Sequence, residues 1–108
     1  MSLKGRSALI TGSTQGLGLA MAERLASLGC NIVMNGLGDA TLIEGRRLAL
    51  EKAHGVRVVH SSADLAQPAQ IETMVKEAEG AFGSIDILIN NAVVRHFAPV
   101  EKFKPSDW

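Results

Sequence analysis

The stretch TGSTQGLG, residues 11–18, decides the fold class expected for this chain. It follows a short apolar run at residues 7–11 and opens a segment whose apolar residues recur every three or four positions. The run predicts a buried strand and the spacing predicts a helix. Because backbone N–H groups at a helix start lack intrahelical partners and face the positive end of the helix dipole, they favour a phosphate. The stretch therefore predicts a phosphate-binding turn between a strand and a helix.

Each of the three glycines in this stretch has an expected task. Gly12 is expected to make the tight turn, Gly16 to let a diphosphate approach the backbone, and Gly18 to let the helix pack close to the sheet. The same residues could serve only as turn formers. The βα units that follow favour the phosphate cradle over that alternative.

The rest of the chain repeats the alternation of short apolar runs and helical spacing. Gly29, Gly55 and Gly83 are expected to end the three helices, Asp39 to cap the second, and Pro68 to begin the third. Strands that alternate with helices imply a parallel sheet covered on both faces, which suits nearly continuous apolar strands. We therefore predict an α/β fold with a doubly wound, Rossmann-like sheet in the order 3-2-1-4. The expected strands are residues 7–11, 31–35, 56–61 and 85–90.

Two helices have a predicted buried face. In both segments the apolar residues lie three or four positions apart, so they share one side of a helix. The predicted faces are Leu17, Met21, Leu25 and Leu28 in the first helix, and Ile71, Met74, Val75, Ala78 and Phe82 in the third.

Composition narrows the classes of function. The 108 residues suffice for one domain, and Lys plus Arg equals Asp plus Glu at 11 each, which gives no basic field for nucleic acid. No apolar run approaches the length of a membrane span, and nothing at the N-terminus resembles a signal peptide. Cys30 is the single cysteine, and His54, His60 and His96 lack metal-ligand spacing. We expect a cytoplasmic protein without a metal site.

Three motifs in chain order resemble the signature of short-chain dehydrogenases/reductases. They are TGSTQGLG at residues 11–18, ADL at 63–65 and NNAV at 90–93. Within that family, NGLGDA at 35–40 and NNAVVRHF at 90–97 are most similar to D-3-hydroxybutyrate dehydrogenases. The resemblance implies hydride transfer between a dinucleotide and a small hydroxy or keto acid, in a homo-oligomer.

The resemblance also implies site residues. Arg95 and His96 are expected near the substrate. Val93 stands where the family has glycine, and Arg95 stands where the hydroxybutyrate enzymes have glutamine. Arg95 either binds a substrate carboxylate or is a solvated loop residue. The residues expected to bind the dinucleotide are Gly12, Thr14, Gln15, Gly16, Leu17, Gly18, Leu37, Asp64, Leu65, Asn91 and Ala92.

The expected cofactor is NAD. An acidic residue near the end of the second strand commonly holds the adenosine ribose of NAD, whereas a basic residue accommodates the 2′-phosphate of NADP. No Arg or Lys occurs within residues 31–39, and Gln15 is uncharged. Gly36 occupies the position usual for the acidic residue. Asp39 either reaches the ribose or caps the second helix.

No catalytic residue is expected within this chain. The family uses a tyrosine as general acid/base, with serine and lysine beside it, and the chain contains no tyrosine. We therefore expect residues 1–108 to be the N-terminal, dinucleotide-binding part of one longer Rossmann-type domain, inactive alone. Two alternatives stay open: a reductase of another substrate class, such as ketones bound to acyl carrier protein, or a nucleotide-binding module without catalysis.

Overall fold

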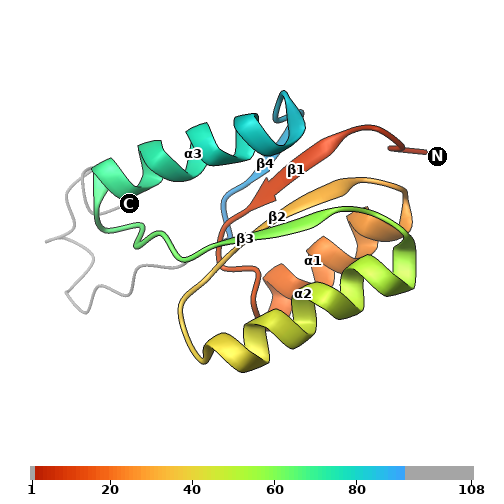
Figure 1. Cartoon of the computed structure of the whole chain (residues 1–108), viewed down its shortest axis with the longest axis horizontal. Helices are drawn as coiled ribbons and strands as arrows, with labels where there is room; N and C mark the ends of the chain where they lie inside the picture. Colours follow the sequence, from red (N-terminus) through yellow and green to blue (C-terminus); the bar gives the residue numbers. More distant parts are fainter. Residues whose placement is uncertain (1, 92–108) are drawn as a thin grey trace, which may run out of the picture.

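A computed structural model describes residues 2–91 of the chain. Four parallel strands form one sheet in the order β3-β2-β1-β4, which confirms the predicted topology (Figure 1). The elements are β1 (Ser7–Ile10), α1 (Gly16–Ser27), β2 (Asn31–Asn35), α2 (Ala40–His54), β3 (Val58–Ser61), α3 (Pro68–Phe82) and β4 (Ile87–Ile89).

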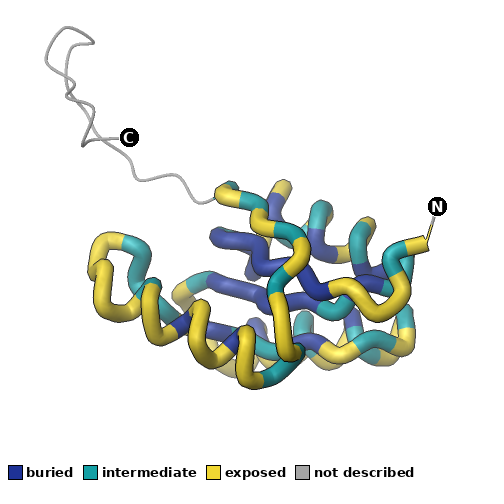
Figure 2. The backbone as a smooth tube through the Cα atoms, turned by 90° about the horizontal axis from the view of Figure 1, so that it is seen from above, coloured by how far each residue is buried: buried dark blue, intermediate teal, exposed yellow. Residues whose placement is uncertain are grey.

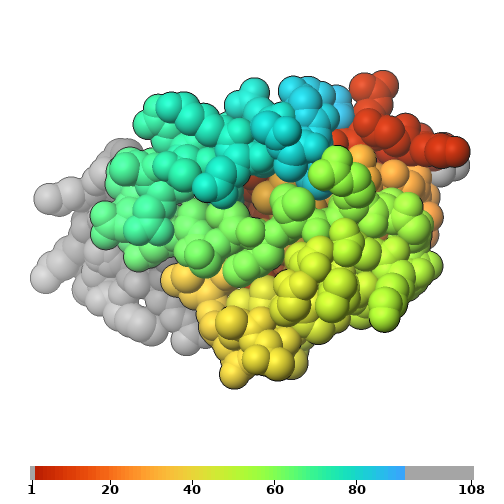
Figure 3. Space-filling view, in the orientation of Figure 1, coloured from red at the N-terminus to blue at the C-terminus, as the bar shows by residue number. Residues whose placement is uncertain are grey.

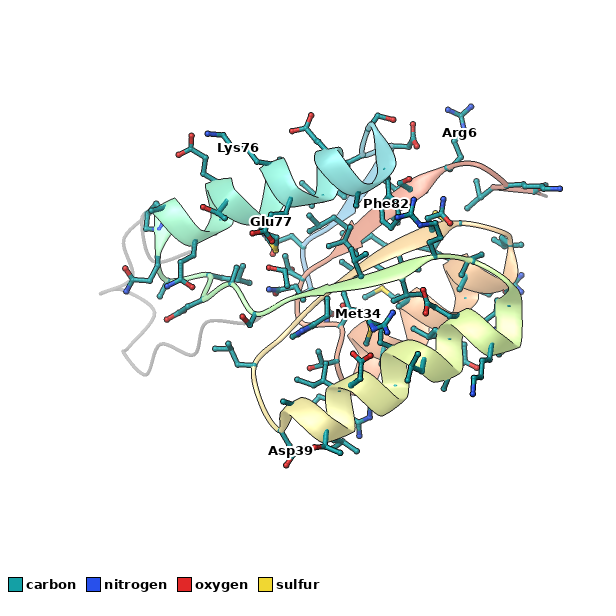
Figure 4. The ribbon with its side chains drawn as sticks, in the orientation of Figure 1. Arg6, Met34, Asp39, Lys76, Glu77 and Phe82 are labelled. Atoms are coloured by element: carbon teal, nitrogen blue, oxygen red, sulfur yellow. The ribbon has the colours of Figure 1, made fainter. Side chains whose placement is uncertain are left out.

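The helices cover both faces of the sheet. α1 and α2 lie on one face and α3 lies on the other (Figure 1). Alternate strand residues separate accordingly: Ile10 and Met34 pack in a cluster with residues of α1 and α2, whereas Leu9 packs with Met74 and Ala78 of α3. Figure 2 shows the buried strands between helices whose outer faces are exposed. In Figure 4, Met34 and Phe82 lie on opposite sides of the sheet.

The predicted helix ends are confirmed. The Asp39 carboxylate accepts a hydrogen bond of 2.8 Å from the backbone N–H of Leu42, at the start of α2 (Figure 4). Gly55 ends α2 with φ +66°, a left-handed conformation that costs glycine no steric strain. Pro68 begins α3 and Gly83 ends it. Three strands are shorter than predicted, since β1 ends at Ile10, β3 begins at Val58 and β4 spans only Ile87–Ile89.

The predicted buried face of α1 is wrong by one position along the helix. Its buried residues are Gly18, Ala22 and Ala26, whereas Leu17 is 70% exposed. α1 lies closely on the sheet, so its contact line consists of small residues, and its larger apolar residues pack beside that line. In α3 the predicted buried face is wrong only at Val75, which is exposed.

Side chains of α2 bond the outer edge of β3. β3 is an edge strand of the described sheet, and α2 adjoins it on the face shown in Figure 3. The Glu51 carboxylate accepts a 3.0 Å hydrogen bond from the N–H of Val58, and the Arg47 guanidinium donates a 2.9 Å bond to the carbonyl of Val58. Arg47 also pairs with Glu44, and this hydrogen bond raises the pKa of Arg47 and lowers the pKa of Glu44. The network stays charged and occupies backbone groups that would otherwise pair with another strand.

Arg47→Met is expected to lower the free energy of unfolding by about 1.5–3 kcal/mol, because the Val58 carbonyl and the Glu51 carboxylate each lose a charged donor. Urea denaturation measures the loss. Lys76→Met is the control, since it removes the exposed ion pair with Glu72 (3.5 Å) and is expected to change stability by less than about 0.5 kcal/mol. If the two substitutions lowered the free energy of unfolding equally, the stabilising role assigned to Arg47 at the edge of β3 would be contradicted.

Candidate functional site

The glycine-rich turn lies at the carboxyl end of β1, between β1 and α1. Ser13 holds it to the sheet: the Ser13 hydroxyl donates a 2.7 Å hydrogen bond to the carbonyl of Ile10, and the Ser13 N–H donates a 2.7 Å bond to the carbonyl of Asn35. Gln15 and Gly16 are exposed at the start of α1. Gln15 makes no side-chain cap, so within residues 2–91 no N-cap side chain uses the first N–H groups of this helix.

Two of the glycines have distinct surroundings. Gly16 has φ +59°, and a Cβ atom built there would have no neighbouring protein atom within 4 Å. At Gly18 a Cβ would lie 2.1 Å from the carbonyl oxygen of Gly12 and 2.7 Å from Nδ2 of Asn91. Gly16 therefore borders open space beside the helix start. Gly18 is required by the contact of α1 with the turn itself, rather than with the sheet as predicted.

Asn91 connects the end of β4 to the same turn. Its backbone N–H donates a 2.9 Å hydrogen bond to the Thr11 hydroxyl, and its amide donates a 3.2 Å bond to the carbonyl of Gly12. β1 pairs with β4 on one side and with β2 on the other, so the turn lies where successive connections leave in opposite directions. This crevice is where open α/β sheets bind ligands. Of the other predicted residues near this end, Ala92, Arg95 and His96 lie outside the described residues.

The end of β2 carries no acidic side chain toward the turn. A Cβ at Gly36 would lie 2.3 Å from the Thr14 hydroxyl oxygen, so the buried Thr14 side chain fills the space that an acidic residue would need. The Asp39 carboxylate accepts a hydrogen bond from the Leu42 N–H, which confirms its expected role as the cap of α2. Leu37, predicted to contact the dinucleotide, is 63% exposed on this loop.

A cavity of about 270 Å³ lies beside that loop. It opens between the loop after β2, the first turn of α2 and the end of β3. The lining residues are Gly36, Leu37, Gly38, Ala40, Ile43, Glu44, His60 and Ser62.

Arg46 of α2 reaches the turn, which sequence reasoning missed. Its guanidinium donates a hydrogen bond of 2.5 Å to the carbonyl of Thr14. Arg46 lies in the second turn of α2, beyond residues 31–39 and the glycine-rich turn, whose lack of positive charge favoured NAD. No local signal marks Arg46, because its contact spans 32 positions of the chain.

Asp64 and Leu65 lie on the loop after β3. One carboxylate oxygen of Asp64 accepts a 2.9 Å hydrogen bond from the Ala66 N–H, while the Asp64 N–H donates a 2.8 Å bond to the Gln70 side chain. Leu65 packs against the cluster that contains Leu9. The loop is thus held in place on the α3 side of the sheet.

The other titratable residues that the structure describes show no metal site. No three His, Cys, Asp or Glu side chains among residues 2–91 are grouped so that they could hold a metal ion. His60 bonds the carbonyl of Gly36 at 2.9 Å, and burial raises the pKa of the Cys30 thiol. Within the same residues no helix is both long and apolar enough to cross a membrane.

Comparison with known proteins places this site in context. A family model described as short chain dehydrogenase matches residues 6–108. The chain is 43% identical to a D-beta-hydroxybutyrate dehydrogenase of Cupriavidus necator, over 98% of this chain and 40% of that protein. It is 40% identical to the enzyme of the same name from Rhizobium meliloti, over 95% of this chain and 40% of that protein. The chain thus spans about 40% of the length of these curated relatives.

A solved structure has the same arrangement of elements. L-Sorbose reductase from Gluconobacter frateurii, complexed with NADPH and L-sorbose, superposes with a TM-score of 0.83 at 32% sequence identity. The match covers 100% of this chain and 41% of that one.

Proposed function

Because this chain belongs to the short-chain dehydrogenase family, we propose that it binds NAD in an enzyme that interconverts a small 3-hydroxy acid and its keto acid. The observation that carries the binding proposal is the turn at the carboxyl ends of β1 and β4. There, Gly16 borders open space and the start of α1 has no side-chain cap among the described residues. Backbone N–H groups at such a position bind a diphosphate.

The complete protein is proposed to contain residues 1–108 as the first part of one longer Rossmann-type domain. The chain has no tyrosine, so the proposed general acid/base and its serine and lysine partners belong to the rest of that domain. The resemblance further supports a homo-oligomer, and a cytoplasmic location is part of the proposal. The substrate, 3-hydroxybutyrate, is proposed from the two relatives named hydroxybutyrate dehydrogenases.

The residues of this chain have separate proposed tasks. Gly12, Thr14, Gln15, Gly16, Leu17 and Gly18 form the diphosphate turn, Leu37, Asp64 and Leu65 contact the adenosine half, and Asn91 and Ala92 contact the cofactor from the end of β4. Arg95 and His96 approach the substrate. When bound, the dinucleotide accepts or returns the hydride. The chain itself binds the cofactor and positions it at the crevice.

NAD is proposed over NADP on the charge near the ribose. Residues 31–39 carry no cation, and the one cation that α2 brings to the turn, the Arg46 guanidinium, donates to the Thr14 carbonyl. The bond from Nη1 holds the Arg46 side chain at the turn, and the proposal of NAD rests on the absence of Arg and Lys from residues 31–39.

The test is steady-state kinetics of the complete protein with D-3-hydroxybutyrate and each dinucleotide. We expect kcat/KM with NAD to exceed that with NADP by at least about tenfold, equivalent to about 1.4 kcal/mol. A preference for NADP that disappears in Arg46→Leu would show that this guanidinium binds the 2′-phosphate and would overturn the NAD proposal. No turnover of hydroxybutyrate, with turnover of a sugar or acyl ketone, would overturn the substrate proposal.

Residues 1–108 alone serve as the control in this assay. They are expected to give no turnover, because the absence of a general acid/base by itself costs about 10²–10⁴-fold in rate. Turnover by residues 1–108 would contradict the proposed division of the domain.

A further inference from the structure

Asn35, the last residue of β2, is a buried polar side chain at the centre of the sheet edge that carries the site. It is 2% exposed. A buried amide is stable only when its hydrogen bonds are made. Its Oδ1 accepts a 3.2 Å bond from the N–H of Gly12. Its Nδ2 donates to the carbonyls of Ser61 at 3.3 Å and Ala63 at 3.1 Å.

These partners belong to two loops that the sheet keeps apart. Gly12 lies in the turn after β1, whereas Ser61 and Ala63 lie at the end of β3 and in the loop that leads to Asp64. β1 and β3 are not neighbours, because β2 lies between them. One side chain thus spans both loops from the intervening strand.

The backbone of the same residue strengthens the connection to the first loop. The Asn35 carbonyl accepts a 2.7 Å hydrogen bond from the Ser13 N–H, and the Asn35 N–H donates a 3.0 Å bond to the Ser13 hydroxyl. The end of β2 therefore moves with the diphosphate turn, and its amide holds the loop after β3 to that unit.

We infer that Asn35 is a positioning residue for the dinucleotide, setting the distance between the diphosphate turn at Gly12 and the adenine-side loop that begins at Ala63. This inference rests on the proposed function. A dinucleotide contacts both loops at once, so its affinity depends on their relative placement, whereas a ligand that contacts one loop does not.

The Asn35→Asp substitution keeps the connection to Gly12 and removes the connection to Ser61 and Ala63. The remaining acceptor oxygen still fits the Gly12 N–H, while an oxygen replaces the donor that faces the Ser61 and Ala63 carbonyls. We expect the Kd of the complete protein for NAD to rise about 10–100-fold at pH 8, with a much smaller change in the Kd for adenosine. At acidic pH the introduced carboxyl group takes up a proton and regains a donor, so the loss for NAD is expected to shrink as pH falls.

The comparison of two ligands distinguishes positioning from a general structural role. A fraction of misfolded protein lowers the apparent affinity for NAD and for adenosine by the same factor. Leu50→Ala is the control, because Leu50 is a buried residue of α2 that packs in the core away from both loops. It is expected to reduce stability without changing the ratio of the two Kd values.

If Asn35→Asp does not fold, Asn35→Ser tests the positioning role instead. Its shorter side chain cannot span both loops but leaves room for water. Titration calorimetry with NAD and a competition assay with adenosine measure both constants. If wild-type protein binds NAD and each folded Asn35 variant keeps the wild-type ratio of the two Kd values, the inference is wrong. If wild-type protein binds neither NAD nor NADP, the proposed function itself fails.

Discussion

Gly18→Ala is expected to weaken NAD binding by the complete protein about 100-fold and to lower its free energy of unfolding by up to about 2 kcal/mol. The added Cβ would lie 2.1 Å from the carbonyl oxygen of Gly12 and 2.8 Å from its carbonyl carbon. Backbone atoms cannot rotate away as the end of a flexible side chain does, so α1 and the turn must separate. Overpacking of this kind costs about 1–3 kcal/mol, and the helix propensity of alanine returns only about 1 kcal/mol.

The expected loss of affinity follows from the same displacement. Moving the turn by about 1 Å misplaces N–H groups that must meet a diphosphate, and misplacements of that size cost about 10²-fold. Isothermal titration with NAD and urea denaturation measure the two effects.

Gly45→Ala is the matched control for that substitution. Gly45 lies within α2, and a Cβ there would meet no atom within 4 Å. We expect it to stabilise the protein by about 0.4–1 kcal/mol and to leave the Kd for NAD unchanged. If Gly18→Ala behaved like Gly45→Ala, the close contact between α1 and the turn would be disproved.

Gly16→Val is expected to weaken NAD binding by a comparable factor, about 100-fold, for a different reason. No protein atom obstructs the new side chain, so the cost arises from φ +59°, which an L-residue adopts at about 1–2 kcal/mol and a β-branched residue with greater difficulty. A valine that keeps this conformation projects into the open space proposed for the diphosphate, and a valine that leaves it reorients the first N–H groups of α1. Both outcomes remove the cradle.

Gly55→Val is the control that measures the backbone cost of valine at a positive φ outside the site. Gly55 has a similar φ of +66° and equally open surroundings, but it ends α2 and makes no contact with the turn. We expect the two valine substitutions to reduce stability to a similar extent in thermal denaturation, while only Gly16→Val reduces affinity for NAD. An unchanged Kd in Gly16→Val would remove the main support for the diphosphate assignment.

The elements and their order can be read from local sequence alone. Short apolar runs, helical spacing, the start signals at Asp39 and Pro68 and the stop signals at Gly55 and Gly83 act over a few residues, and each was confirmed. The alternation of strands and helices then restricts the topology, since parallel strands need crossover connections of one hand. The motifs at residues 11–18, 63–65 and 90–93 each lie at or just after the end of a predicted strand. Because the predicted strands are parallel, these motifs place the expected site at the carboxyl ends of the strands.

The buried face of α1 and the side chains that hold the site together follow from tertiary packing. Spacing locates a helix but not how closely it approaches its neighbours. Contact with the turn requires Gly18, and close packing of the helix buries Ala22 rather than Leu17. The bonds of Arg46 to Thr14 and of Asn35 to Gly12 join residues 32 and 23 positions apart. Such contacts leave no periodic pattern in a sequence, because the chain is brought together there by packing of the whole sheet and its helices rather than by the preferences of neighbouring residues.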